Sequence, residues 1–89
     1  MVWQKKYADA EPLLNSLIKE RPNELVLVEL LADVYSWQKQ YDKATKLYKR
    51  LLSKNYNPKN IEFKLAEDLR FSGKDEEAVK FYKKYLGLI

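Results

Sequence analysis

The sequence repeats itself at an offset of 34 residues, and this repetition restricts the possible folds more than any other feature. Residues 22–55 align with residues 56–89 without a gap, and identical residues recur in that register: Asn23/Asn57, Leu31/Leu65, Ala32/Ala66, Ala44/Ala78, Lys46/Lys80, Tyr48/Tyr82, Lys49/Lys83 and Leu52/Leu86. The motif Trp-Gln-Lys-X-Tyr occurs at residues 3–7 and again at 37–41, so the N-terminal segment shares the register. A period of this length is typical of arrays in which each repeat is one supersecondary unit.

Within each repeat the apolar residues follow helical spacing in two blocks. In the middle repeat the first block runs from Leu27 to Tyr35, and the second runs from Tyr41 to Leu52. The sequence therefore predicts an all-α chain of antiparallel neighbours joined by short turns. Five helices are expected, at residues 6–20, 24–37, 40–54, 58–72 and 75–87.

Residues typical of helix ends separate these blocks. Asn23 and Asn57 are expected N-caps, and Pro58 suits a first helical position. Ser72-Gly73 is expected to end one helix before Asp75 begins the next. Pro12 is expected within about the first turn of its helix, where backbone N–H groups are largely unpaired.

The composition excludes much catalytic and metal chemistry within these 89 residues. The chain has no Cys and no His, so thiolate nucleophiles, Cys-type zinc sites and the usual general base are missing. It has two Gly and no phosphate-binding loop, and its acidic residues alternate with Lys along helix faces, as in Glu76-Glu77 with Lys80. We therefore expect no enzyme activity, no cofactor and no metal site. The longest apolar run, at residues 25–31, is interrupted by Glu29 and falls short of a membrane span, so a soluble chain is expected.

The repeated positions resemble the tetratricopeptide repeat (TPR) family. In the middle repeat the matching residues are Leu31-Ala32, Tyr35, Tyr41, Ala44, Tyr48 and Leu52, and in the last repeat Leu65-Ala66, Leu69, Gly73, Ala78, Tyr82 and Leu86. The chain departs from the family at Val28 and Glu62, Lys39, Tyr56 and Asp75. The resemblance implies a right-handed α-solenoid of antiparallel helix pairs, forming a single domain. Residues 1–21 would be the second half of a repeat and residues 22–55 and 56–89 two full repeats, together a piece of a longer protein.

Arrays of this family use a concave surface, lined by the first helix of each repeat, to bind peptide segments of partner proteins. The resemblance thus implies a scaffold or adaptor module, in which the following residues are expected to line the groove: Val26, Glu29, Leu30, Asp33, Trp37, Asn60, Phe63, Lys64, Glu67, Arg70 and Phe71. Ser36, Val2 and Trp3 continue the same line. Trp37 and Phe71 are the expected anchors for apolar side chains. Packing at the helix turns is the alternative role for the two Trp residues.

Charge is distributed unevenly along the chain, whose net charge is +4. Residues 24–37 carry three acidic residues and no basic one, whereas residues 39–54 carry six basic residues and one acidic one. Asp33 and Glu67 stand where the carboxylate-gripping members of the family need Asn, so a partner with a basic or apolar face is expected. The Lys residues between Tyr41 and Tyr48 would also suit a nucleic acid. These tyrosines fall on the apolar stripe, however, and a protein partner is favoured.

A second function is left open by the apolar residues at the chain's end. Leu86, Leu88 and Ile89 follow the last helical stripe without a polar cap, which solenoid ends need for solubility. Self-association, or assembly within a larger repeat protein, is therefore the alternative, and a homo-oligomer is one possible outcome. The compartment is not decided by the sequence: the cytoplasm and the bacterial envelope both fit, and arrays with a Trp-containing turn resemble those of envelope and surface-polysaccharide proteins.

Overall fold

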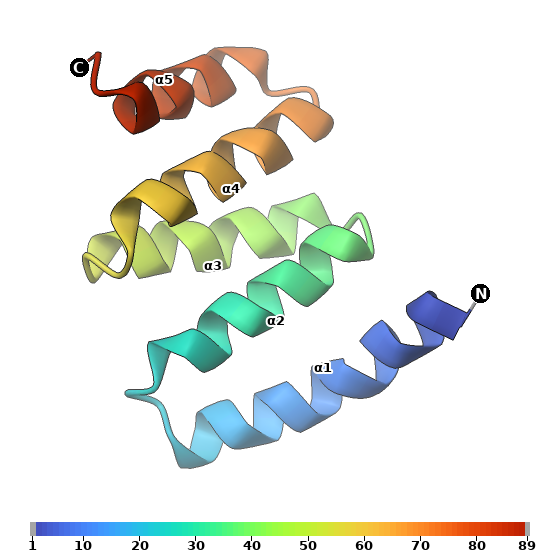
Figure 1. Ribbon diagram of the computed structural model, residues 1–89. Helices are drawn as coiled ribbons and strands as arrows, with labels where there is room; N and C mark the ends of the chain where they lie inside the picture. Colours follow the sequence, from blue (N-terminus) through green and yellow to red (C-terminus); the bar gives the residue numbers. More distant parts are fainter. Residues whose placement is uncertain (1, 89) are drawn as a thin grey trace.

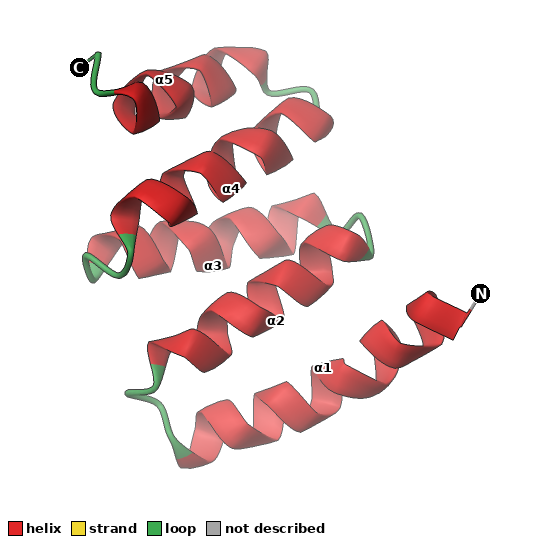
Figure 2. Cartoon of the chain, viewed as in Figure 1, coloured by secondary structure: helices red, strands yellow, loops and turns green. Residues whose placement is uncertain are grey.

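The computed structural model describes the backbone of residues 2–88 and the side chains of residues 8–88. Over this range the chain is a stack of five helices (Figures 1 and 2). These are α1 (Val2–Glu20), α2 (Leu25–Trp37), α3 (Tyr41–Ser53), α4 (Pro58–Phe71) and α5 (Asp75–Leu86). Consecutive helices run in opposite directions, and each one packs chiefly against the next in sequence. The all-α helical repeat and its five helices are confirmed.

The stack is thin, with principal extents of 38 × 31 × 16 Å. In Figure 1, α3 lies behind α2 and α4, so the first helices of the two full repeats come together on one face. We call this surface the α2–α4 face. Because a helix with its side chains is about 10–12 Å wide, a stack this thin leaves one side of every helix close to solvent.

Two apolar clusters stabilise the stack from opposite sides of α2. The smaller cluster joins α2 to α1 through Leu14, Leu31 and Val34. The larger cluster joins α2 to the last three helices and consists of Val28, Ala32, Ala44, Tyr48, Leu51, Ile61, Leu65, Leu69 and Ala78. The four repeated Ala residues are fully or almost fully buried, as their small size at helix contacts predicts. Since the two clusters meet at α2, the packing runs from α1 to α5 without a break.

The helix ends agree with the sequence to within one residue, with one exception. The first helix begins at Val2 instead of residue 6, which makes Pro12 its eleventh residue. Pro12 therefore lies in the helix interior, and the expectation of a first-turn position was wrong. Its missing N–H leaves the carbonyl of Ala8 without a helical partner. Ala8 is exposed, so water can satisfy that carbonyl.

The expected caps are only partly correct. Pro58 does open α4, and Ser72 and Asp75 do bound the turn before α5. Asn23 is not an N-cap, because that position of α2 is taken by Glu24. Asn57 does hold the N-cap position of α4, but it has a left-handed backbone with φ of 40° and its side chain makes no capping hydrogen bond. These helix starts depend on packing more than on side-chain caps.

Candidate binding face

The groove residues expected from the sequence all lie on α2 and α4. Six of the eleven line one cavity of about 270 Å³ between these helices: Asp33, Trp37, Phe63, Lys64, Glu67 and Phe71. Five others lie outside its lining: Val26, Glu29, Leu30, Asn60 and Arg70. Val26 and Leu30 are exposed apolar residues of α2. The side chains of Val2 and Trp3 lie outside the described residues.

Three aromatic side chains border the cavity and remain open to solvent. Trp37 and Phe71 are each 57% exposed, and Phe63 is 40% exposed. Phe63 packs on α5, where its ring centre is 5.2 Å from that of Tyr85. Phe71 packs on α3, with its ring centre 5.9 Å from that of Tyr41. Neighbouring helices thus position the rings of Phe63 and Phe71 while part of each ring stays exposed to solvent.

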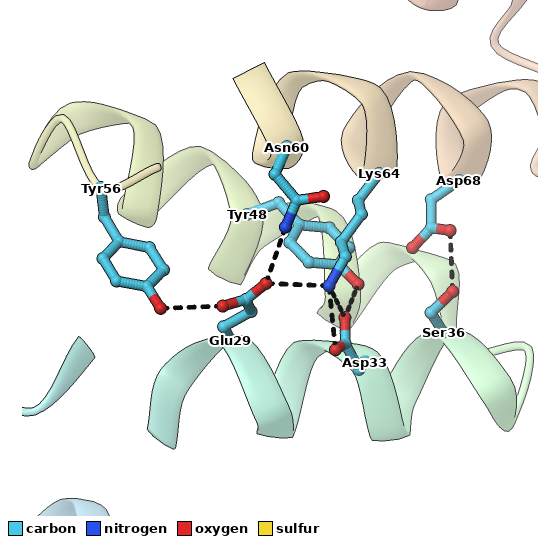
Figure 3. Close-up of polar contacts among 8 residues, drawn as sticks. All are labelled: Glu29, Asp33, Ser36, Tyr48, Tyr56, Asn60, Lys64 and Asp68. Carbon is cyan, nitrogen blue, oxygen red and sulfur yellow. Dashed lines mark hydrogen bonds and ion pairs between the residues drawn. The ribbon is translucent and has the colours of Figure 1, made fainter. Parts of the chain in front are cut away.

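Lys64 links α4 to α2 through two carboxylates (Figure 3). Its Nζ lies 2.8 Å from Oε2 of Glu29, and 3.1 and 3.0 Å from Oδ1 and Oδ2 of Asp33. Burial alone would lower the pKa of Lys64. The hydrogen bonds and charges of the two carboxylates have the larger combined effect and raise this pKa above its usual value. The ion pairs therefore hold two helices that belong to different repeats.

Two further donors form hydrogen bonds with the carboxylate of Glu29. The hydroxyl of Tyr56 donates to Oε1 at 2.8 Å, and the amide of Asn60 donates to Oε2 at 3.1 Å (Figure 3). Burial acts to raise the pKa of Glu29, but the hydrogen bonds from Lys64 and Tyr56 lower it below its usual value. Tyr56 stands where Pro22 stands one repeat earlier, so this departure from the family pattern supplies a polar contact.

These pairings add a detail that the sequence interpretation did not contain. Asp33, one of the two acidic residues from which a basic or apolar partner was expected, is bonded to Lys64, and so is Glu29. The two partners lie 35 and 31 residues from Lys64 in sequence. Spacing along one helix does not reveal such a pair, because it depends on how α2 and α4 stack.

Asp68 is a site residue that the sequence interpretation missed. It lines the cavity from α4, is only 3% exposed, and accepts a 2.8 Å hydrogen bond from Ser36 at Oδ1 (Figure 3). Its buried Oδ2 has no hydrogen-bond partner among the described residues. Burial raises the pKa of Asp68 to about 6, with further contributions from the charges of Asp33 and Glu67. The repeat contains a signal for it: Asp68 stands where Val34 is buried one repeat earlier.

Tyr48 is the second lining residue that the sequence interpretation missed. Its position on the apolar stripe of its helix predicted only a packing role. Its hydroxyl reaches the cavity and donates a 2.6 Å hydrogen bond to Oδ1 of Asp33. Burial, followed by this bond, raises the pKa of Tyr48 above its usual value. Because Tyr48 is buried, its ring is not presented for stacking on nucleic-acid bases, and the ring of Tyr41 packs on Phe71.

In residues 8–88, for which side chains are described, no group of three or more acidic residues is arranged to hold a metal ion. No helix in the described part of the chain is both long enough and apolar enough to cross a membrane.

A stack of antiparallel helices with a 34-residue period, and a cavity between its first helices, defines a helical-repeat protein. The sequence model of the family described as Tetratricopeptide repeat matches residues 4–66, and the chain belongs to this family. Tetratricopeptide repeats are generally protein-protein interaction modules. A comparison with curated proteins found no match.

Proposed function

We propose that this chain is a non-catalytic interaction module that binds a peptide segment of a partner protein on its α2–α4 face. The observation that carries the proposal is the cavity bordered by Trp37, Phe63 and Phe71, each with at least 40% of its surface exposed. Aromatic residues supply much of the binding energy in protein interfaces. The cavity is slightly smaller than the roughly 300–1,000 Å³ of pockets that enclose a small molecule. It suits a single side chain of a longer ligand.

The polar network supports binding on the α2–α4 face because it fixes the relative positions of the two helices in the absence of a partner. Lys64, Glu29 and Asp33 connect the two helices that form the cavity, and the larger apolar cluster packs beneath them. Binding to a preformed face avoids part of the entropy cost of ordering side chains and backbone. We also propose that residues 1–89 act as one domain, which the continuous packing from α1 to α5 supports.

Selection of binding peptides from a random display library tests the proposal. Peptides that bind the purified chain should shift the NMR signals of α2 and α4, including the indole N–H of Trp37. Trp37→Ala and Phe63→Ala should each weaken binding by about tenfold or more, as expected for aromatic residues at an interface centre. Circular dichroism checks that both variants keep their helices.

Leu13→Ala is the matched control, because Leu13 is an exposed apolar residue on α1, away from the cavity. It should leave binding unchanged. If selected peptides bind Trp37→Ala and Phe63→Ala as well as they bind the unchanged chain, the α2–α4 face is not the binding surface.

Self-association through the end of the stack is the second candidate function. Leu86 and Leu88 are 65% and 66% exposed, and Val79 of α5 is exposed as well. Ile89, which the sequence interpretation included, lies outside the described residues. Light scattering across a concentration series should show a higher mass that Leu88→Lys removes. A strict monomer at every concentration would rule out this function for the chain.

A further inference from the structure

The inner wall of the cavity has an unused hydrogen-bond acceptor. Oδ2 of Asp68 is buried without a partner, although Oδ1 of the same carboxylate accepts from Ser36. A buried carboxylate oxygen left without a donor loses its hydration and gains no hydrogen bond in return, which is unfavourable. Because Asp68 lines the cavity, a donor that enters this space could supply the missing bond.

The charges around the cavity favour a cationic donor. Three carboxylates line it, those of Asp33, Glu67 and Asp68, and Lys64 is the one cation among the described lining residues. Lys64 is already bonded to Glu29 and Asp33, so its charge is engaged by these two carboxylates. With Glu29 and the nearby Arg70 included, four carboxylates face two cations. The cavity region therefore keeps an excess of negative charge for a ligand to neutralise.

The rim of the cavity already shows how such a cation is held. Nη2 of Arg70 lies 2.9 Å from Oε2 of Glu67, and its guanidinium carbon lies 5.0 Å from the ring centre of Phe71. A guanidinium is planar, stacks on aromatic faces and donates several hydrogen bonds in one plane. The ring of Phe71 and the carboxylate of Glu67 thus lie close enough together for one arginine side chain to contact both.

We propose that the cavity between α2 and α4 binds an arginine side chain of the partner segment, with its stem against Trp37 and Phe63 and its guanidinium toward Glu67 and Asp68. This inference rests on the proposed function and adds the chemistry of the partner. Arg70 competes with the incoming arginine for Glu67. The ligand's donors supply the bond that Oδ2 of Asp68 lacks.

Four blocked peptide pools test this assignment. All are random except for one central residue, which is Arg, its neutral isostere citrulline, Gln or Glu. Titration calorimetry should show the Arg pool binding about tenfold more tightly than the citrulline pool, and the Glu pool should bind worst. The advantage of the Arg pool should shrink as salt is added, because screening weakens exposed charge interactions.

Variants of the chain localise the effect. Glu67→Gln and Asp68→Asn should each remove most of the preference for Arg over citrulline, and Glu67→Gln provides the test if Asp68→Asn disturbs folding. Arg70→Gln should raise the affinity for the Arg pool by roughly threefold, because it removes a competing cation. Glu76→Gln, which neutralises an exposed carboxylate on α5, is the matched control and should change nothing.

The outcomes separate the two proposals. Equal binding of the Arg and citrulline pools on the α2–α4 face would overturn the arginine assignment and leave the proposed function standing. Absence of binding by every pool would contradict the proposed function itself. Dimers of the chain that Glu67→Gln dissolves would identify a second copy as the occupant, and would overturn the assignment to a partner protein.

Discussion

The hydroxyl of Tyr48 on α3 donates a 2.6 Å hydrogen bond to Asp33 on α2. The equivalent pair one repeat later is Tyr82 on α5 and Glu67 on α4, where burial and the neighbouring Glu67 carboxylate raise the pKa of Tyr82. In both pairs the tyrosine follows the acidic residue by 15 positions, and the pairs themselves are 34 residues apart. In the middle repeat the second helix thus holds a carboxylate of the first helix through a hydrogen bond. In both repeats that carboxylate lines the cavity.

Tyr48→Phe should lower the free energy of unfolding by about 1–2 kcal/mol, since it removes a hydrogen bond to a charged group while Asp33 keeps its bonds to Lys64. Tyr82→Phe should cost less, because Tyr82 is only partly buried. Urea denaturation of both variants measures the difference. An equal loss in the two repeats would show that burial does not set the value of this contact.

Lys64→Met should destabilise the chain by about 2–4 kcal/mol at neutral pH, because it leaves Glu29 and Asp33 mostly buried without their cation. Lys49→Met is the control: Lys49 pairs with Glu77 at 3.7 Å with both side chains about half exposed, and such pairs contribute little. Similar losses in the two variants would contradict a structural role for the network.

The network also predicts a pH dependence. The pKa of Glu29 is lowered in the folded chain, so its contribution to stability is present above its unfolded value near 4.5 and is lost as pH falls through the folded value. Lys64→Met should therefore reduce the dependence of stability on pH in the acid range. Unchanged acid denaturation in Lys64→Met would contradict this assignment.

Asp68 should give the opposite dependence. Its folded pKa of about 6 lies above the usual aspartate pKa of 3.8, so the folded state binds more protons between these values, and stability falls as pH rises through this window. The groups that face Asp68 are Ser36 and Asp33 on α2, Tyr48 on α3, and Lys64 and Glu67 on α4.

Asp68→Asn removes the titrating group, so its stability relative to the unchanged chain should be greater at pH 7.5 than at pH 4. The difference should amount to about 1–3 kcal/mol, given roughly 1.4 kcal/mol per pKa unit. Thermal unfolding of both proteins across this range measures it. A difference that stays constant with pH would show that Asp68 does not titrate in the window.

Lys39 and Gly73 occupy the same turn position in successive repeats, and both have a left-handed backbone, with φ of 63° and 85°. A residue with a Cβ pays about 1–2 kcal/mol for this conformation, and glycine does not. Lys39→Gly should therefore stabilise the chain by about 0.5–1 kcal/mol after the entropy cost of glycine in the unfolded state. Gly73→Ala should destabilise it, although no atom crowds the added Cβ. Thermal melting points that move in the same direction would contradict the argument from backbone strain.

Much of the fold was predictable because it depends on local periodicity. The 34-residue offset and the apolar spacing predicted five helices, with all ends but one within a residue of those observed. The expected start of α1 at residue 6 was wrong, because the helix begins at Val2 and keeps Pro12 in its interior. Asn23 was misread as a cap because cap propensity does not show where packing begins a helix.

The candidate binding face also combines features that follow from the sequence with features that depend on the tertiary structure. The repeat register by itself determined which residues of α2 and α4 share a face, because helical spacing and a fixed period are properties of the chain read in order. Only the tertiary structure decided which charges on that face are satisfied. Lys64 reaches Glu29 and Asp33 across two repeats, while Asp68, at a position that is apolar one repeat earlier, keeps a buried oxygen without a donor. Ion pairs and desolvation depend on distances and burial between helices, which the order of residues does not contain.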